Sequence, residues 1–307
     1  MLRIRKILFP TDFSEASRAA LDHALLWAEL HDSDLLLLHV LALRTADPFH
    51  PEHHFPEPDE LEARIHALAE SEMAKLLEDH QEKPLRIRKT VRRAPEIERG
   101  ILDFAEAEGV DLLVMGTHGR RGPAHLLIGS VTAEVLRRSD RPILVVPSRD
   151  GRAAGRFRRI LAPTDFSPSS LAAAGTARHL AAETGAVLEL FHVVPELEIP
   201  LPMNPGGLGP AATLVQDLIP AARAALDRIA AEKGPKAEIE TEVWQGSAAP
   251  SILNRAAETD ADLVVLSTHG HTGLDRWLLG SVAEKVARLS KCPVLVVPAH
   301  GKSLVAG

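Results

Sequence analysis

The sequence predicts an α/β protein made of two tandem doubly wound domains, each a five-stranded parallel sheet with helices on both faces. The first observation is an internal repeat, because PTDFS occurs at Pro10–Ser14 and again at Pro163–Ser167. The second is that short apolar runs alternate with segments of helical spacing in both halves. The third is that the apolar runs are continuous, as in LLLLHV, which is typical of strands covered on both faces. Such alternation requires parallel strands joined by right-handed crossovers.

The repeat has a nearly constant offset, which indicates a tandem duplication and sets the domain count. Asp12 and Asp165, for example, are 153 positions apart. The length of 307 residues is ample for two domains of about 150 residues each. We therefore expect one domain at residues 1–149 and another at 156–299. The short, polar and glycine-bearing stretch Ser148–Arg156 is expected to join them.

Five strands and four helices are expected in the first half. KILF is a short apolar strand, and the segment after PTDF has Ala20, Ala24 and Trp27 at helical spacing. The Pro- and His-rich stretch Leu41–Asp59 is expected to be a loop. The expected strands are Lys6–Phe9, Leu35–Val40, Leu85–Val91, Asp111–Gly116 and Ile143–Val146. The expected helices are Ser14–Leu30, Glu60–Asp79, Pro95–Glu108 and Ser130–Arg138.

The second half repeats this order, with a loop that extends to about Ala212. Its expected strands are Ile160–Ala162, Val187–Val193, Ala237–Val243, Asp262–Ser267 and Val294–Val297. Its expected helices are Ser167–Thr184, Thr213–Glu232, Pro250–Thr259 and Ser281–Ser290.

Composition argues against several classes of protein. The net charge of -7 lacks the basic excess of a nucleic-acid binder. No apolar run approaches the ~20 residues of a membrane span, and the N-terminal segment lacks the apolar core of a signal peptide. Cys292 is the single cysteine, so neither an internal disulfide nor a thiolate metal cluster can form. These features favour a soluble cytoplasmic protein that binds neither nucleic acid nor membrane.

A glycine-spaced segment in each half suggests a phosphate site. Gly116, Gly119 and Gly129 follow the spacing G-x2-G-x9-G, and Ser130 comes next. The first two glycines leave a strand at its carboxyl end, where open α/β sheets bind ligands. Ser130 begins a helix, whose free N–H groups and dipole attract anions, and its hydroxyl can cap that helix or donate to phosphate. The alternative is that the glycines only make turns and the serine only caps.

The second half keeps most of this segment but has Ser267 where the first half has Gly116. If that position needs a positive φ, serine there is strained, and the second site is expected to be weaker or to select another phosphate state. Neither half contains the P-loop motif, nor a G-x-G-x-x-G after its first strand, so those two kinds of nucleotide site are not supported.

These residues resemble the universal stress proteins, specifically their tandem members, along nearly the whole chain. Three matches carry the resemblance: PTDFSE at Pro10–Glu15, GTHGRRGPAHLLIGS at Gly116–Ser130 and RPILVVP at Arg141–Pro147. Glycine spacing followed by serine is the motif of the family's ATP-binding branch. The resemblance implies two sites for ATP, with or without Mg²⁺.

In that branch the aspartate after the first strand contacts ribose or adenine, the end of the second strand lines the adenine pocket, and the glycine loop holds the phosphates. The residues expected at the first site are Pro10, Thr11, Asp12, Val40, Met115, Gly116, Gly119, Arg120, Gly129, Ser130 and Val131. Those expected at the second site are Pro163, Thr164, Asp165, Val193, Ser267, Gly270, His271, Gly280, Ser281 and Val282. A carboxylate at Asp12 can accept bonds from ribose hydroxyls; its alternative role is to cap the helix that begins at Ser14.

The resemblance implies an ATP-binding stress protein whose nucleotide occupancy regulates its shape or its choice of an unidentified protein partner. A slow ATPase and a scaffold with a vestigial site are the alternatives. We identify no catalytic residue and no metal site. In single-domain relatives the last strands pair across a dimer, so Ile143–Val146 and Val294–Val297 are expected to pair within one chain as a pseudo-dimer. A further homodimer stays open.

Other polar features have competing explanations. The loop Asp47–Asp59 carries three histidines, and a lid or partner loop is favoured over a metal site. His39 and His192 close apolar strands and are expected to be buried and hydrogen-bonded. His118 and His269 either approach phosphate or turn outward.

The third strand of each half is charged, with opposite signs. Arg86 and Arg88 in one half correspond to Glu238 and Glu240 in the other. Charged edge strands deter unwanted pairing, or the opposite signs guide assembly.

Overall fold

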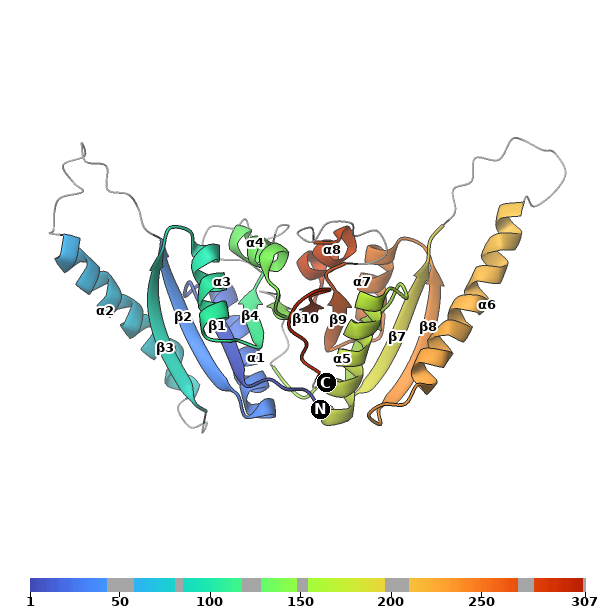
Figure 1. Ribbon diagram of the computed structural model, residues 1–307, viewed down its shortest axis with the longest axis horizontal. Coiled ribbons are helices and arrows are strands. Elements are labelled where there is room, and N and C mark those ends of the chain that lie inside the picture. Colours follow the sequence, from blue (N-terminus) through green and yellow to red (C-terminus); the bar gives the residue numbers. More distant parts are fainter. Residues whose placement is uncertain are drawn as a thin grey trace. The chain divides into compact units, whose positions relative to one another are not determined.

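The computed structural model describes residues 1–42, 58–80, 85–117, 128–147, 154–196, 210–269 and 279–305. The chain divides into two compact units. The first unit is Arg3–Ala154, and the second unit is Gly155–Gly307 together with Met1–Leu2. Each unit contains a five-stranded sheet whose paired strands are all parallel, with helices packed against it (Figure 1). The expected α/β class with two tandem doubly wound domains is confirmed.

In the first unit, the sheet order is β3-β2-β1-β4-β5. The strands are β1 (Lys6–Pro10), β2 (Asp34–Ala42), β3 (Ile87–Ala94), β4 (Leu112–Gly116) and β5 (Ile143–Val146). The helices are α1 (Glu15–His31), α2 (Pro58–Leu76), the short 3-10 helix η2 (Glu78–His80), α3 (Ile97–Ala107) and α4 (Ser130–Arg138).

In the second unit, the order is β10-β9-β6-β7-β8. The strands are β6 (Arg159–Pro163), β7 (Val187–Val194), β8 (Glu238–Gln245), β9 (Leu263–Ser267) and β10 (Val294–Val297). The helices are α5 (Pro168–Thr184), α6 (Pro210–Ala231), α7 (Ala248–Glu258) and α8 (Ser281–Leu289). Pairing between β5 and β10, the closing strands of the two units, stays a prediction.

The expected elements are all present, and their ends differ by a few residues. Strand β3 runs to Ala94, beyond its expected end, because its parallel register with β2 continues from Leu35↔Ile87 to Ala42↔Ala94. Helix α2 starts two residues earlier than expected, at Pro58, since proline fits the first position of a helix.

The order of connections places the site. In the first unit the chain moves outward from β1 to β3 and then returns to add β4 on the other side of β1. Right-handed crossovers then put α1 and α2 on one face and α3 and α4 on the other. The direction reverses between β1 and β4, and between β6 and β9 in the second unit. The carboxyl ends of strands at such a reversal frame a crevice.

The continuous apolar run of β2 is covered on both faces, as expected. Leu35, Leu37 and Leu38 are 0% exposed and Leu36 is 3% exposed. Trp27 of α1 is also fully buried. Burial of each such side chain stabilises the fold by about 1.5–3 kcal/mol.

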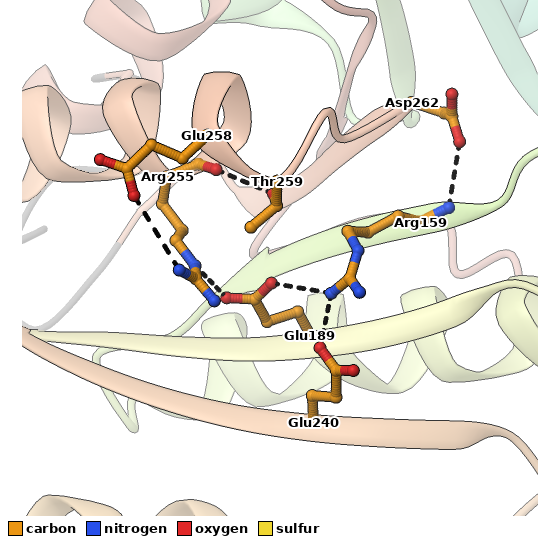
Figure 2. A network of polar contacts seen from close by, with 7 residues as sticks. All are labelled: Arg159, Glu189, Glu240, Arg255, Glu258, Thr259 and Asp262. Carbon is orange, nitrogen blue, oxygen red and sulfur yellow. Dashed lines mark hydrogen bonds and ion pairs between the residues drawn. The ribbon is translucent and has the colours of Figure 1, made fainter.

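The second unit replaces part of this apolar packing with an ion-pair network (Figure 2). Glu189 of β7 is 0% exposed and lies between two arginines. Its carboxylate oxygens lie 3.2 Å from Nη1 of Arg159 and 2.5 Å from Nε of Arg255. Arg159 also pairs with Glu240 at 2.6 Å, and Arg255 lies 5.6 Å from the ring centroid of Trp244. The two arginines offset the cost of burying Glu189, because a buried carboxylate without a partner is strongly unfavourable.

At the corresponding positions of the first unit, the buried residues are apolar, and the arginine and the aromatic residue have changed places. Leu36 corresponds to Glu189 and Phe104 to Arg255, by the offset of the repeat. On the edge strand, Arg92 corresponds to Trp244, and Arg92 lies 5.5 Å from the centroid of the Phe104 ring. One unit therefore has arginine on the strand and an aromatic ring on the helix, and the other has the reverse.

Glu240 makes the stability of the second unit depend on pH in the acidic range. A hydrogen bond from Arg159 lowers the pKa of Glu240 below its ordinary value of 4.5. Because the folded pKa is depressed, this contribution is fully present above 4.5 and is lost as the pH falls through the folded value. We expect Glu240→Gln to lower the free energy of unfolding near neutral pH and to converge with the wild type in acid. Urea unfolding at a series of pH values measures this difference. A difference in the free energy of unfolding that stays the same at every pH would contradict the prediction.

The charged side chains of the edge strands form ion pairs within their own units. Arg86 contacts Asp34 at 2.5 Å and Asp32 at 3.1 Å, and Arg88 contacts Glu108 at 2.6 Å. These contacts favour a local role for the charges over the guidance of assembly. No helix in the described part of the chain is both long and apolar enough to cross a membrane.

Candidate functional site

The turn after β1 is a small hydrogen-bonded unit. Thr11 continues the strand, because its N–H donates to the Leu38 carbonyl at 2.8 Å. Its hydroxyl Oγ1 accepts the Phe13 N–H at 3.1 Å and lies 2.7 Å from the Ser17 hydroxyl. The Ser14 N–H donates to Oδ1 of Asp12 at 3.0 Å. The aspartate is therefore held at the carboxyl edge of the sheet, where the turn enters α1.

The turn after β6 repeats this geometry. Oγ1 of Thr164 accepts the Phe166 N–H at 3.0 Å and lies 2.9 Å from the Ser170 hydroxyl. The Ser167 N–H donates to Oδ1 of Asp165 at 3.0 Å, and the Ser167 hydroxyl adds a second bond at 2.6 Å. Both turns thus present their aspartate in the same way.

The alternative role of Asp12 as a helix cap is wrong, because the cap of α1 is Ser14. Ser14 accepts the Ser17 N–H on its own side chain, and Asp12 lies two residues before it. The turn also contains strain. Phe13 has φ 63° and Phe166 has φ 66°, in the left-handed region that bulky residues avoid. Each costs on the order of 1–2 kcal/mol, which the surrounding contacts must offset.

Gly116 ends β4, and there is no room for a side chain at this position because α1 lies too close. A Cβ there would stand 2.7 Å from the carbonyl oxygen of Ala16. Gly116 is not among the residues with positive φ. Its own carbonyl accepts the Thr132 hydroxyl of α4 at 2.9 Å. Glycine is required for close packing between β4 and the first turn of α1.

Ser267 takes the equivalent place in the second unit, and the expected strain is wrong there. Ser267 also has no positive φ. Its hydroxyl donates to the His269 carbonyl at 2.6 Å, and the Ser169 hydroxyl donates to the same oxygen at 2.8 Å. The serine thus fixes the turn after β9, so removing it is expected to loosen this turn rather than to relieve strain.

Gly116→Ala should lower the free energy of unfolding of the first unit by about 1–3 kcal/mol, as overpacking does. The physical reason is the 2.7 Å approach to the Ala16 oxygen, which cannot be met without a backbone shift. Chemical denaturation measures the loss. Gly175→Ala in α5 is the matched control, because a Cβ there meets nothing within 4 Å. Equal stability of Gly116→Ala and wild type would refute the packing explanation.

The last glycine of each segment lies directly before α4 or α8. Gly129 and Gly280 are the N-cap residues, and neither makes a side-chain cap bond. Ser130 is the first helical residue, so the expected role of its side chain as a cap is wrong. The Gly129 N–H donates to the Thr117 carbonyl at 2.6 Å, which holds the helix start beside the end of β4. N–H groups in an uncapped first turn can donate to an anion.

Val40 and Val193 lie near the carboxyl ends of β2 and β7, which run on to Ala42 and Val194 and are therefore longer than expected. Val40 is 7% exposed and is backed by α3, where a Cβ on Gly100 would lie 2.8 Å from its Cγ1. Val193 is half-buried and pairs in register with Trp244.

The described residues of the predicted site therefore gather at the carboxyl ends of three neighbouring strands. In the first unit these residues are Pro10, Thr11, Asp12, Val40, Met115, Gly116, Gly129, Ser130 and Val131. In the second unit they are Pro163, Thr164, Asp165, Val193, Ser267, Gly280, Ser281 and Val282. The predicted residues Gly119, Arg120, Gly270 and His271, with His118, lie outside the described residues.

Sequence reasoning missed three hydroxyls beside these turns, those of Ser17, Ser170 and Thr268. Ser17 and Ser170 occupy equivalent positions of the repeat, and Thr268 corresponds to Thr117. Repetition of the same residue type at one offset was the signal that could have found them. The hydroxyl of Thr268 lies 2.9 Å from Nδ1 of His269, so this histidine is hydrogen-bonded beside the strand end.

Among the described residues, no group of three or more His, Cys, Asp or Glu side chains is placed to hold a metal ion. The histidine-rich loop falls mainly on residues 43–57, outside the described ranges.

Comparisons with known proteins agree with the repeat. The model of the universal stress protein family matches residues 3–147 and again 156–298. A universal stress protein of Mycolicibacterium smegmatis is 28% identical over 95% of this chain and 96% of its own length. Universal stress protein MJ0577 of Methanocaldococcus jannaschii is 30% identical over 48% of this chain and 96% of its own. A solved universal stress protein of Archaeoglobus fulgidus has the same fold, with a TM-score of 0.68 at 20% identity, and covers 96% of this chain and 98% of its own.

Proposed function

This chain belongs to the universal stress protein family, and we propose that each of its two units binds an adenine nucleotide at the carboxyl edge of its sheet. The role is regulatory: an occupied site changes which partner or shape the protein favours. We assign no hydrolytic step to these sites.

The observation that carries the proposal is the convergence of three groups at the reversal of strand order. Asp12 lies in the turn after β1, Val40 lies near the carboxyl end of β2, and Gly129 is the N-cap of α4. A carboxylate suits ribose hydroxyls, an apolar side chain suits a base, and helix N–H groups suit phosphate. The same three groups recur in the second unit, as Asp165, Val193 and Gly280.

The proposed arrangement is also sensible electrostatically. The aspartates lie in the turns that follow β1 and β6, whereas the phosphate groups would lie at the starts of α4 and α8, so the like charges are assigned to different elements. Arg137 and Arg138 end α4 and match the negative end of its dipole. The positive end of the helix is then left for the ligand.

A universal stress protein that is 28% identical to this chain, over 47% of it, has been solved in complex with cAMP. Adenine nucleotides with different phosphate groups are therefore candidate ligands. We favour ATP, with or without Mg²⁺, because the glycine spacing that ends in Ser130 resembles the ATP-binding branch.

The proposal is tested by identifying what the protein carries. Mass spectrometry of the ligand released from purified, denatured protein should find an adenine nucleotide. Calorimetric titration of nucleotide-free protein with ATP, ADP, AMP and cAMP, each with and without Mg²⁺, should then rank them. Absence of any released nucleotide together with no measurable binding of all four would overturn the proposal.

A further inference from the structure

A histidine near the carboxyl end of the second strand contacts the aspartate-bearing turn in both units. Nδ1 of His39 lies 2.7 Å from the carbonyl oxygen of Thr11, and the His39 ring centroid lies 4.6 Å from that of Phe13. In the second unit, Nδ1 of His192 lies 2.8 Å from the Thr164 oxygen, and the ring centroid lies 4.5 Å from Phe166. We call each set of three residues a histidine clamp.

The chemistry of the clamp determines which ring nitrogen carries hydrogen. A carbonyl oxygen can only accept a hydrogen bond, so Nδ1 must donate. Each histidine therefore has its proton on Nδ1, whatever the state of Nε2. The bond ties the end of β2, or of β7, to the first residue of the neighbouring turn.

The ring contact acts on the strained residue of that turn. Phe13 and Phe166 have φ of 63° and 66°. The interplanar angles of the two ring pairs, 33° and 34°, agree within a degree. Strain that is kept in both copies, with the same two contacts, indicates a turn whose conformation matters. The residue held between the carbonyl contact and the ring contact is the aspartate, Asp12 or Asp165.

We propose that His39 and His192 are positioning residues, which hold Asp12 and Asp165 in the orientation that a nucleotide requires. The inference rests on the proposed function for its ligand. The histidines act through the turn and not by contact with the ligand. Their contribution to binding should therefore disappear when the aspartates are absent.

The experiment is a double-mutant cycle on the full chain, followed by calorimetric titration with ATP. The leucine pair His39→Leu/His192→Leu removes the bond and the ring. The asparagine pair His39→Asn/His192→Asn keeps a donor, because the amide nitrogen of asparagine is bonded to Cγ as Nδ1 is. The aspartate pair Asp12→Ala/Asp165→Ala removes the positioned group. Circular dichroism verifies that each variant is folded.

We expect the leucine pair to weaken ATP binding about tenfold, which is about 1.4 kcal/mol. The asparagine pair should recover most of this loss. Adding the leucine pair to the aspartate pair should cause no further loss, because both changes remove one effect. Losses that multiply, or an asparagine pair as weak as the leucine pair, would overturn the inference. If the leucine pair does not fold, Phe13→Gly/Phe166→Gly replaces it, since glycine accepts the positive φ but lacks the ring.

A ligand-free measurement separates failure of this inference from failure of the proposed function. Hydrogen exchange at the amides of Phe13, Ser14, Phe166 and Ser167 should be faster in the leucine pair and near wild type in the asparagine pair. Wild-type protein that binds no nucleotide contradicts the proposed function, and this exchange pattern still tests the clamp. Exchange that is unchanged in the leucine pair would show that the histidines do not hold the turns.

Discussion

Arg255→Phe should destabilise the second unit by about 3–5 kcal/mol, because it leaves a buried carboxylate short of a partner. Glu189 is 0% exposed, and Arg255 donates to it at 2.5 Å. After the substitution, Arg159 at 3.2 Å would be the one cationic partner left to it in the described part of the chain. Chemical denaturation measures the loss in the free energy of unfolding of the second unit.

The double variant Glu189→Leu/Arg255→Phe should recover most of that stability. It installs the side chains that the first unit has at the corresponding positions, Leu36 and Phe104. Arg159 keeps Glu240 at 2.6 Å. Apolar replacement of a buried ion pair is often neutral or stabilising.

Arg99→Phe in α3 is the matched control for Arg255→Phe. Its ion pair with Asp103 is 62% and 63% exposed, so a change within about 1 kcal/mol is expected. A double variant as unstable as Arg255→Phe alone would show that the network is not equivalent to the apolar pair.

Ser130→Asp/Ser281→Asp should reduce nucleotide affinity at least a hundredfold, about 2.7 kcal/mol, while the fold stays intact. Both serines are exposed and are the first residues of α4 and α8. An acidic residue there favours the helix by about 0.3–1 kcal/mol. It would repel phosphate, since two unit charges about 4 Å apart interact by about 4 kcal/mol at an effective dielectric of about 20. Calorimetry with ATP and thermal unfolding of the same variant give the two quantities.

Two controls isolate the charge. Ser130→Ala/Ser281→Ala removes only the hydroxyls and should cost less affinity than the aspartates. Ser247→Asp places the same charge at the N-cap of α7, outside the predicted site, and should leave binding unchanged. Wild-type affinity in the double aspartate variant would exclude these two helix starts from the phosphate site.

The repeat and the apolar runs were enough to predict the fold. Continuous runs such as Leu35–Leu38 are typical of strands covered on both faces, and alternation with helices then favours a parallel sheet. The elements were therefore found in order. Their ends were less accurate, as in β3, because the pairing register with β2 and not local sequence decides where a strand stops.

At the candidate site, the sequence determined which residues meet at the edge of the sheet, because residues that follow parallel strands must lie at the same edge. It did not determine why they are there. Gly116 is a glycine because Ala16, 100 positions earlier, lies too close for a Cβ. The strained turn of Phe13 is stabilised by His39, and Glu189 is tolerated because Arg159 and Arg255 surround it.

Each of these pairs joins residues far apart in sequence, whose distance is set only when helices and strands pack. The local sequence pattern indicates whether a residue prefers to be buried and with which period apolar residues recur. It does not indicate which atom from a distant part of the sequence will lie within 3 Å of that residue. The repeat, the strand order and the edge that carries the site thus follow from sequence, whereas close contacts and compensated charges are decided by tertiary packing alone.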